Sequence, residues 1–150
     1  MLGEKYEIRA GQCLMIDESQ KTVTINIRDP GHRRRFLRYL RKTLLSEIEQ
    51  AIDRHSQKLG VKVKCVRIKK LRRRWGSCSE NGNINFNLWL VCLPRELIHY
   101  VALHEVAHLK EMNHGRGFRR IIKGEMENHK DLEKRLRRIR VSPPVSLMSG

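Results

Sequence analysis

The sequence has no long apolar segment. Its longest uninterrupted apolar run is Leu88–Pro94, far short of the ~20 residues that a helix needs to cross a bilayer. The beginning of the chain, MLGEKYEIRAGQ, contains no apolar stretch of the kind that defines a secretory signal peptide. We therefore expect an intracellular, cytoplasmic protein that makes no contact with a membrane.

Paired cysteines and aromatic residues are also scarce. The four cysteines stand at positions 13, 65, 78 and 92, and no two of them form the C-x-x-C pair typical of zinc ribbons and thioredoxin-like redox sites. We interpret them as idle thiols in a reducing compartment. Aromatic residues make up 5% of the chain, which argues against a protein that reads single-stranded nucleic acid by base stacking.

Acidic residues are outnumbered two to one. Thirty-two Lys and Arg face sixteen Asp and Glu, which gives a formal net charge of +16. The basic residues concentrate in three blocks, at 33–42, 62–74 and 116–140. One such run usually forms only a solvated surface, but three runs with few compensating acids favour contact with a polyanion, such as nucleic acid or the phosphates of a nucleotide.

Hydrophobic patterning predicts one α+β domain at residues 1–140 and a flexible tail at 141–150. Apolar and polar residues alternate in the segments expected to be strands, which are 4–9, 21–28, 61–68, 73–79 and 83–88. Apolar residues recur every three or four positions in the segments expected to be helical, which are 32–59, 95–112 and 118–139. The expected architecture is a small antiparallel or mixed sheet packed on a buried helix at 95–112, with a long N-terminal helix and C-terminal helices.

Two short signals should end these elements. Gly60 follows the first predicted helix, at the position where a left-handed residue is favoured. Asn81-Gly82 separates two predicted strands, and Asn-Gly is a strong signal for a β-hairpin turn. We therefore expect the strands at 73–79 and 83–88 to pair as a hairpin.

The predicted helix at 95–112 contains the sequence His104-Glu105-Val106-Ala107-His108. Histidines four positions apart project from one face of a helix, so both imidazoles can reach one Zn²⁺ ion. Glu105 would then stand beside the metal, where it could accept a proton from water, as in metallopeptidases with an HExxH motif. Burying two imidazoles and a carboxylate in such an apolar helix costs several kcal/mol unless they find partners, which favours a bound metal.

The third metal ligand is expected to be His114. If the helix continued past His108, His114 would face away, so the chain must leave the helix and turn back. Asn113 and Gly115 tolerate the positive φ that such a turn needs. The spacing matches the metzincin histidine triplet, but Glu111 replaces its glycine and no Met-turn follows, so we do not assign the chain to that group. The alternative third ligands lie on the following helical segment and are Glu125, Glu127 and His129.

Several motifs in order resemble the YgjP-like metallopeptidase-domain family. The matching segments are RWGSCS at 74–79, INFN at 84–87, Leu90, Pro94 and HEVAHLKEMNHGRGF at 104–118. The match is detailed over about residues 60–120 and looser before them. Distant relatives of this family include SprT-like and WLM zinc proteases, some of which act on proteins attached to DNA.

The resemblance implies a zincin-like fold that binds one zinc ion through His104, His108 and His114, with Glu105 as the catalytic acid and base. Two residues depart from the family pattern. His99 stands where an aspartate is usual, and Arg119 replaces the tryptophan that follows Phe118. Neither change removes a ligand. His99 could alter a contact near the metal or only pack, and Arg119 changes a wall of the core or of the cleft.

We therefore expect a zinc hydrolase that attacks a peptide carbonyl of a peptide or protein substrate. The group that stabilises the oxyanion is not fixed, and His99, Tyr100 or a hairpin residue are the candidates. The strand at 73–79 could border the cleft and pair with an extended peptide, with no chemical role for Cys78. Three alternatives remain open, which are a zinc hydrolase of nucleotides or phosphoanhydrides, a nucleic-acid-associated SprT-like protease, and a non-catalytic basic module with structural zinc.

Overall fold

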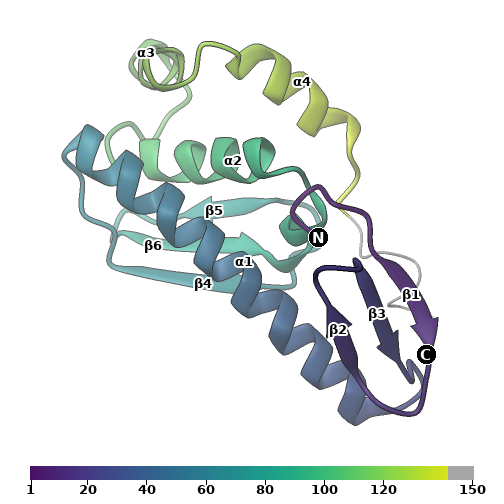
Figure 1. Ribbon diagram of the computed structural model, residues 1–150. Coiled ribbons are helices and arrows are strands. Elements are labelled where there is room, and N and C mark those ends of the chain that lie inside the picture. Colours follow the sequence, from purple (N-terminus) through teal and green to yellow (C-terminus); the bar gives the residue numbers. More distant parts are fainter. Residues whose placement is uncertain (142–150) are drawn as a thin grey trace.

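The computed structural model describes residues 1–141, so the predicted tail lies outside the described residues except for Val141. Within this range, the chain forms two three-stranded sheets and four α-helices, as the α+β prediction requires (Figure 1). None of the helices within residues 1–141 combines the length and the apolar composition that spanning a membrane would require.

The N-terminal sheet contains β1 (Glu7–Ala10), β2 (Met15–Asp17) and β3 (Thr22–Ile25). Strand β3 is central, parallel to β1 and antiparallel to β2. The alternation of Val23 and Ile25 was a correct signal, because both side chains are buried. The strand predicted at 4–9 begins later in the structure, and the strand predicted at 21–28 is shorter. Strand β2 was not predicted, because its three residues are too few to show a period.

Helix α1 (Pro30–Leu59) crosses the molecule from the N-terminal sheet to the far end of the second sheet (Figure 1). The Asp29 side chain accepts hydrogen bonds from the backbone N–H groups of Gly31 and His32, which stabilises the first turn. Gly60 ends the helix with a left-handed φ of 64°, as predicted. The buried face of α1 joins the two sheets in one hydrophobic core.

The second sheet contains β4 (Cys65–Lys69), β5 (Gly76–Cys78) and β6 (Asn83–Asn87), in the order β4-β6-β5. The predicted hairpin is confirmed, because β5 and β6 are antiparallel and Gly82 turns with a φ of 79°. Strand β4 starts four residues later than predicted and pairs in parallel with β6. A short 3-10 helix, η1 (Leu88–Cys92), then leads to the next helix.

Helix α2 (Arg95–Ala107) packs against α1 and β5, and its apolar residues are buried, as predicted. It ends earlier than the predicted Met112, since His108 is its C-terminal cap. Between α2 and the next helix the chain forms turns, in which the N–H groups of Leu109 and Lys110 donate hydrogen bonds to the carbonyls of the last two helical residues.

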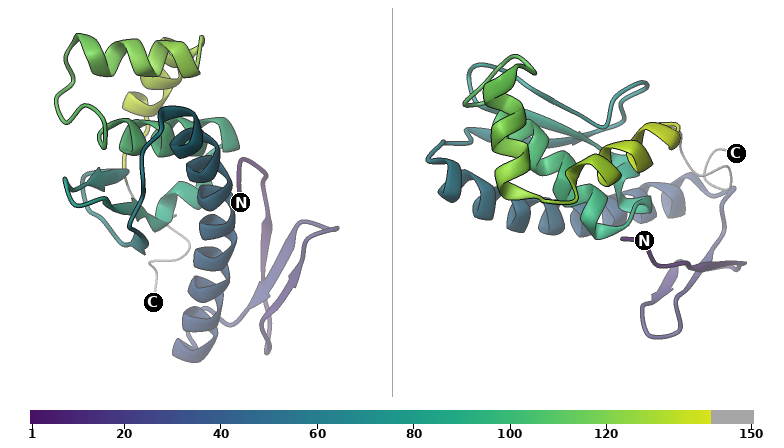
Figure 2. Two further views of the ribbon diagram at one scale, coloured as in Figure 1. Left: turned by 90° about the vertical axis from the view of Figure 1, so that its left-hand side faces the viewer. Right: turned by 90° about the horizontal axis from the view of Figure 1, so that it is seen from above.

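The C-terminal helical segment is divided, where a single run at 118–139 was predicted. Helices α3 (Arg116–Glu125) and α4 (His129–Arg138) are separated at Met126, whose backbone is extended with φ −139° and ψ 107°. The break lets both helices pack on α2 (Figure 2). Phe118 and Ile122 are buried from α3, and Leu132 is buried from α4, which a straight helix would not direct to the same neighbour.

Candidate metal centre

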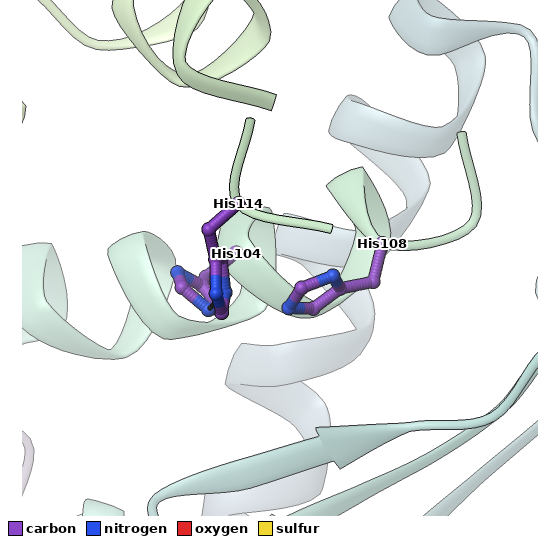
Figure 3. Close-up of side chains that lie close together, drawn as sticks. All are labelled: His104, His108 and His114. Carbon is purple, nitrogen blue, oxygen red and sulfur yellow. Dashed lines mark hydrogen bonds between the residues drawn. The ribbon is translucent and has the colours of Figure 1, made fainter. Parts of the chain in front are cut away.

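Three histidine side chains converge at the C-terminal end of α2 (Figure 3). One ring nitrogen from each of His104, His108 and His114 lies within 4.8 Å of the other two. The Nε2 atoms of His104 and His114 are 3.1 Å apart. Nitrogens bound to one tetrahedral zinc ion at about 2.0–2.1 Å are about 3.3 Å apart, so the observed spacing is close to that of a metal site.

The convergence follows from the local chain path. His104 lies in the last turns of α2 and His108 caps it, so the two imidazoles share one face, with ring centroids 5.0 Å apart. His114 returns from the loop before α3, and its ring centroid lies 4.7 Å from that of His108. The prediction that Asn113 and Gly115 would need positive φ was wrong, because neither residue has one. Gly115 instead caps α3 in an extended conformation.

Phe118 packs against all three imidazoles. Its ring centroid lies 4.9 Å from that of His104 and 4.7 Å from those of His108 and His114, and the side chain is only 4% exposed. Aromatic contact of this kind limits the movement of the rings. Sequence reasoning gave Phe118 no role, although its position four residues after His114 could have suggested contact across the first turn of α3.

Burial favours the neutral form of two of the three histidines, His104 and His108. Burial, and to a lesser extent the neighbouring His108 and His114, lowers the pKa of His104 to about 4. Burial also lowers the pKa of His108. The Nδ1 of His108 lies 3.3 Å from the backbone carbonyl of Glu111, so a proton on Nδ1 leaves Nε2 free. Neutral imidazole is the form that binds metal ions.

Glu105 lies on α2 beside the first histidine and faces β5. Its side chain is 6% exposed, and no hydrogen bond or ion pair joins it to another side chain of residues 1–141. A Cβ atom on Gly76 would lie 2.6 Å from the Oε1 of Glu105, so only glycine permits this approach. Burial raises the pKa of Glu105 to about 7, against the opposing effect of Arg74. Such a carboxyl group is suited to exchange protons near neutral pH.

The alternative third ligands lie outside the cluster. Glu125 pairs with His55 at 3.0 Å and with Lys58 at 3.3 Å. The Nδ1 of His129 lies 2.9 Å from the Met126 carbonyl. Among residues 1–141, the group of side chains able to hold a metal is therefore the histidine triad alone.

Of the candidates for the oxyanion-stabilising group, His99 does not reach the site. Its Nε2 lies 2.7 Å from the Oε1 of Glu47, a buried residue of α1. Tyr100 does line the space beside His104, and the two ring centroids are 6.3 Å apart. Burial raises the pKa of the Tyr100 hydroxyl to about 12, so it remains a hydrogen-bond donor at neutral pH.

Two cavities open on the triad. The first, of about 580 Å³, is lined by β5 and α4 residues together with His104 and Glu105. The second, of about 740 Å³, lies between α3 and α4 and reaches His104 and His114. Strand β5 therefore borders the cleft at Gly76, as predicted. Burial raises the pKa of the Cys78 thiol to about 11, so the thiolate that a chemical role would require is not formed at neutral pH.

Two asparagines on β6 stabilise the hairpin and the loop that precedes it. Asn87 donates hydrogen bonds from Nδ2 to the backbone carbonyls of Leu71 and Arg74, at 2.8 and 2.9 Å, which fixes the loop before β5. Asn85 donates to the Ser77 hydroxyl across the hairpin. Neither is a site residue.

Comparison with known proteins agrees with this geometry. The chain is similar to the metallopeptidase zymogen abylysin of Pyrococcus abyssi, with 27% identity, a TM-score of 0.54, and coverage of 59% of this chain and 90% of that one. It shares its fold with the metallopeptidase zymogen jannalysin of Methanocaldococcus jannaschii, with 22% identity, a TM-score of 0.55, and coverage of 61% and 88%. None of the curated proteins compared with the chain matches it significantly.

The family comparison covers nearly the whole described chain. The model of the YgjP-like metallopeptidase domain matches residues 1–139, which include both sheets and all four α-helices of the described chain. Membership of a metallopeptidase family implies a metal ion, and the histidine triad is the donor set available for it among the described residues. The match over this length, together with the architecture and the triad, shows that the protein belongs to the YgjP-like metallopeptidase domain family.

Proposed function

We propose that the protein is a zinc-dependent peptidase in which His104, His108 and His114 hold one zinc ion and Glu105 is the catalytic acid and base. The observation that carries this proposal is the convergence of three imidazoles beside a buried carboxylate. Three histidines leave a fourth tetrahedral position open, which is typical of catalytic rather than structural zinc sites. The donor set also favours zinc over magnesium or calcium, which prefer oxygen ligands.

Glu105 is placed to move protons during hydrolysis. A bound zinc ion supplies Lewis acidity, which polarises a carbonyl and lowers the pKa of water to about 7. The Glu105 carboxylate accepts a proton from the attacking water and then donates it to the leaving amine, so that Glu105 is ionised again at the end of the reaction. Gly76 keeps β5 close enough to hold the carboxylate without displacing it.

The cleft suits an extended polypeptide. Strand β5 pairs with β6 on one side only, so its outer edge has backbone groups available for another strand. Gly76 lines the cavity beside His104 and Glu105, so a peptide added along this edge would pass the triad. Tyr100 lies within the same wall and can donate a hydrogen bond to a developing oxyanion.

Metal analysis and turnover test the proposal together. The protein purified without chelator is expected to hold one zinc ion per chain, which His108→Ala loses. Glu105→Gln should retain the zinc and fold normally but lose peptide hydrolysis by at least about 100-fold, since general acid–base catalysis contributes 10²–10⁴-fold.

Other results would select one of the alternatives. Hydrolysis of nucleoside triphosphates without hydrolysis of unfolded protein would identify a phosphoanhydride hydrolase. Proteolysis that requires DNA and weakens steeply with salt would indicate a nucleic-acid-associated protease. Stoichiometric zinc without any turnover would indicate a structural metal in a binding module, and absence of zinc would contradict the proposal.

A further inference from the structure

The two cavities at the triad form the two arms of one groove. They share four lining residues, Tyr100, His104, Glu133 and Arg137. One arm extends from His104 toward the loop before β5 and the end of α4, and the other extends between α3 and α4. The groove therefore passes on both sides of the place where a scissile bond would lie.

Both arms are basic. The lining residues with positive charge are Arg72, Arg73 and Arg140 in the first arm, and Arg119, Lys123 and Lys130 in the second, with Arg137 between them. The acidic lining residues are Glu105 and Glu133. Glu133 already forms an ion pair with Arg137. Among residues 1–141, the six basic side chains of the two arms have no acidic partner, so the groove carries a large uncompensated charge.

This charge is positioned by ordered elements. Asn87 fixes the backbone on both sides of Arg72 and Arg73 through its two hydrogen bonds to the loop. Arg119 and Lys123 stand four residues apart on α3 and share one face, where like charges destabilise an isolated helix. A negative ligand would relieve that repulsion.

A polypeptide fits the groove better than a nucleic acid does. The free edge of β5 offers backbone hydrogen bonds, which an extended peptide can use and a nucleic acid cannot match in register. Stacking surfaces for bases are scarce, since Tyr100 and Phe118 are 6% and 4% exposed and Trp75 is the one partly exposed Phe, Tyr or Trp side chain that lines the groove among residues 1–141. The first basic block, on α1, contributes no residue to either arm.

We propose that the groove selects acidic polypeptide segments, with Asp or Glu side chains on both sides of the bond to be cleaved. This inference rests on the proposed peptidase function for its cleavage step, but its binding step does not require turnover. Carboxylates of the substrate would pair with Arg72 and Arg73 in one arm and with Arg119 and Lys123 in the other.

Binding is tested first, with the Glu105→Gln variant and labelled peptides of one sequence that carry Glu, Gln or Lys at the flanking positions. Fluorescence anisotropy should show the Glu peptide binding at least about 10-fold more tightly than the Gln peptide, with the difference shrinking as salt rises. The Lys peptide should bind most weakly. Equal affinities for the three peptides would overturn the inference.

Single substitutions then assign the two arms. Two peptides that carry Glu on one flank only should bind more tightly than the Gln peptide to the protein without these substitutions. In Arg73→Gln, only one of the two peptides should lose this higher affinity. In Lys123→Gln, only the other peptide should lose it. Arg38→Gln, an exposed residue of α1 outside the groove, is the matched control and should change nothing. Loss of the preference in the control as well as in the groove variants would contradict a local site.

Cleavage separates this inference from the proposed function. If the wild-type protein cleaves all three peptides at equal rates and binds them equally, it is a peptidase without this selectivity. If it cleaves none but binds the Glu peptide through Arg73 and Lys123, the groove is acidic-selective and the peptidase proposal fails. Tighter binding of a single-stranded oligonucleotide or of a nucleoside triphosphate through the same two residues would overturn the acidic polypeptide as the ligand.

Discussion

Ionisable residues occupy two sides of helix α2, and the two sides differ in how their charged groups are partnered. Toward α1, His99 contacts Glu47 at 2.7 Å, and Arg95 pairs with the same carboxylate at 3.0 Å. Toward the groove, His104 has other histidines as its neighbours, and Glu105 has no ion pair within residues 1–141. The carboxylate on the α1 side has two partners of opposite or potentially opposite charge, whereas the groove side brings together three imidazoles and a carboxylate without an ion pair among residues 1–141.

The difference shows how to separate structural from functional histidines in this fold. A histidine that contacts a buried carboxylate, as His99 contacts Glu47, stabilises the packing of two helices and needs no ligand. Three imidazoles with their nitrogens directed at one point cannot satisfy one another fully, because at most one proton can lie between any two of the nitrogens. A bound cation would satisfy all three lone pairs at once.

The largest effect is expected when a histidine substitution at the triad is compared with a histidine substitution on the α1 side of α2. His114→Ala should remove the metal and all measurable turnover, whereas His99→Ala should retain one zinc ion per chain. The second variant leaves the buried Glu47 with one partner fewer, which we expect to lower the free energy of unfolding by about 1–3 kcal/mol. Metal analysis and thermal unfolding of both variants measure this. Loss of zinc from His99→Ala would remove the distinction between the two sides.

Substitution of two glycines tests whether the close approach of β5 to Glu105 matters for catalysis. Gly76→Ala would place a Cβ atom 2.6 Å from the Glu105 Oε1, which displaces the carboxylate, so we expect kcat to fall by about 100-fold with zinc retained. Gly124→Ala is the control, since a Cβ there meets nothing within 4 Å on α3. It should leave kcat unchanged and stabilise the protein by about 0.4–1 kcal/mol. Equal kcat values for both variants would show that the approach of β5 to Glu105 has no catalytic value.

A smaller effect is expected from His55, which is 3% exposed and pairs with Glu125. Burial lowers the pKa of His55, and the attraction of Glu125 opposes this shift without cancelling it. The unfolded chain then binds the proton more tightly than the folded protein does, so stability should fall as pH decreases through about 6.5. We expect the unfolding free energy of the wild type to fall relative to that of His55→Gln when both are measured from pH 8 to pH 5. A wild type that gains stability relative to the variant at low pH would show that the ion pair dominates.

Much of the fold could be read from the sequence because its signals are local. The period of three and four located α1 and α2, Gly60 and Asn81-Gly82 ended their elements, and the HExxH spacing placed two imidazoles on one helix face. The parallel pairing of β4 with β6 had no local signal, because it joins segments separated by the β5 hairpin strand. The break at Met126 likewise has neither Gly nor Pro at the point of extension and follows from packing on α2.

The site was predictable in its donors and not in its surroundings. The histidine spacing required a chain reversal before His114, but the sequence could not show that Phe118 would pack on the three rings. Nor could it show that His99 would turn toward Glu47, 52 residues earlier in the chain. Basic residues were visible as blocks, and only the fold brings parts of the second and third blocks together around one groove.

X-ray absorption spectroscopy of the zinc-loaded protein tests the central claim most directly, because it identifies the atoms bound to the metal. We predict a zinc ion with three imidazole nitrogens at about 2.0–2.1 Å and one further light-atom ligand, with no sulfur. In His104→Ala this signal should disappear. A zinc–sulfur distance of about 2.3 Å, which would implicate any of the four free cysteines, or failure to bind zinc in stoichiometric amounts, would contradict it.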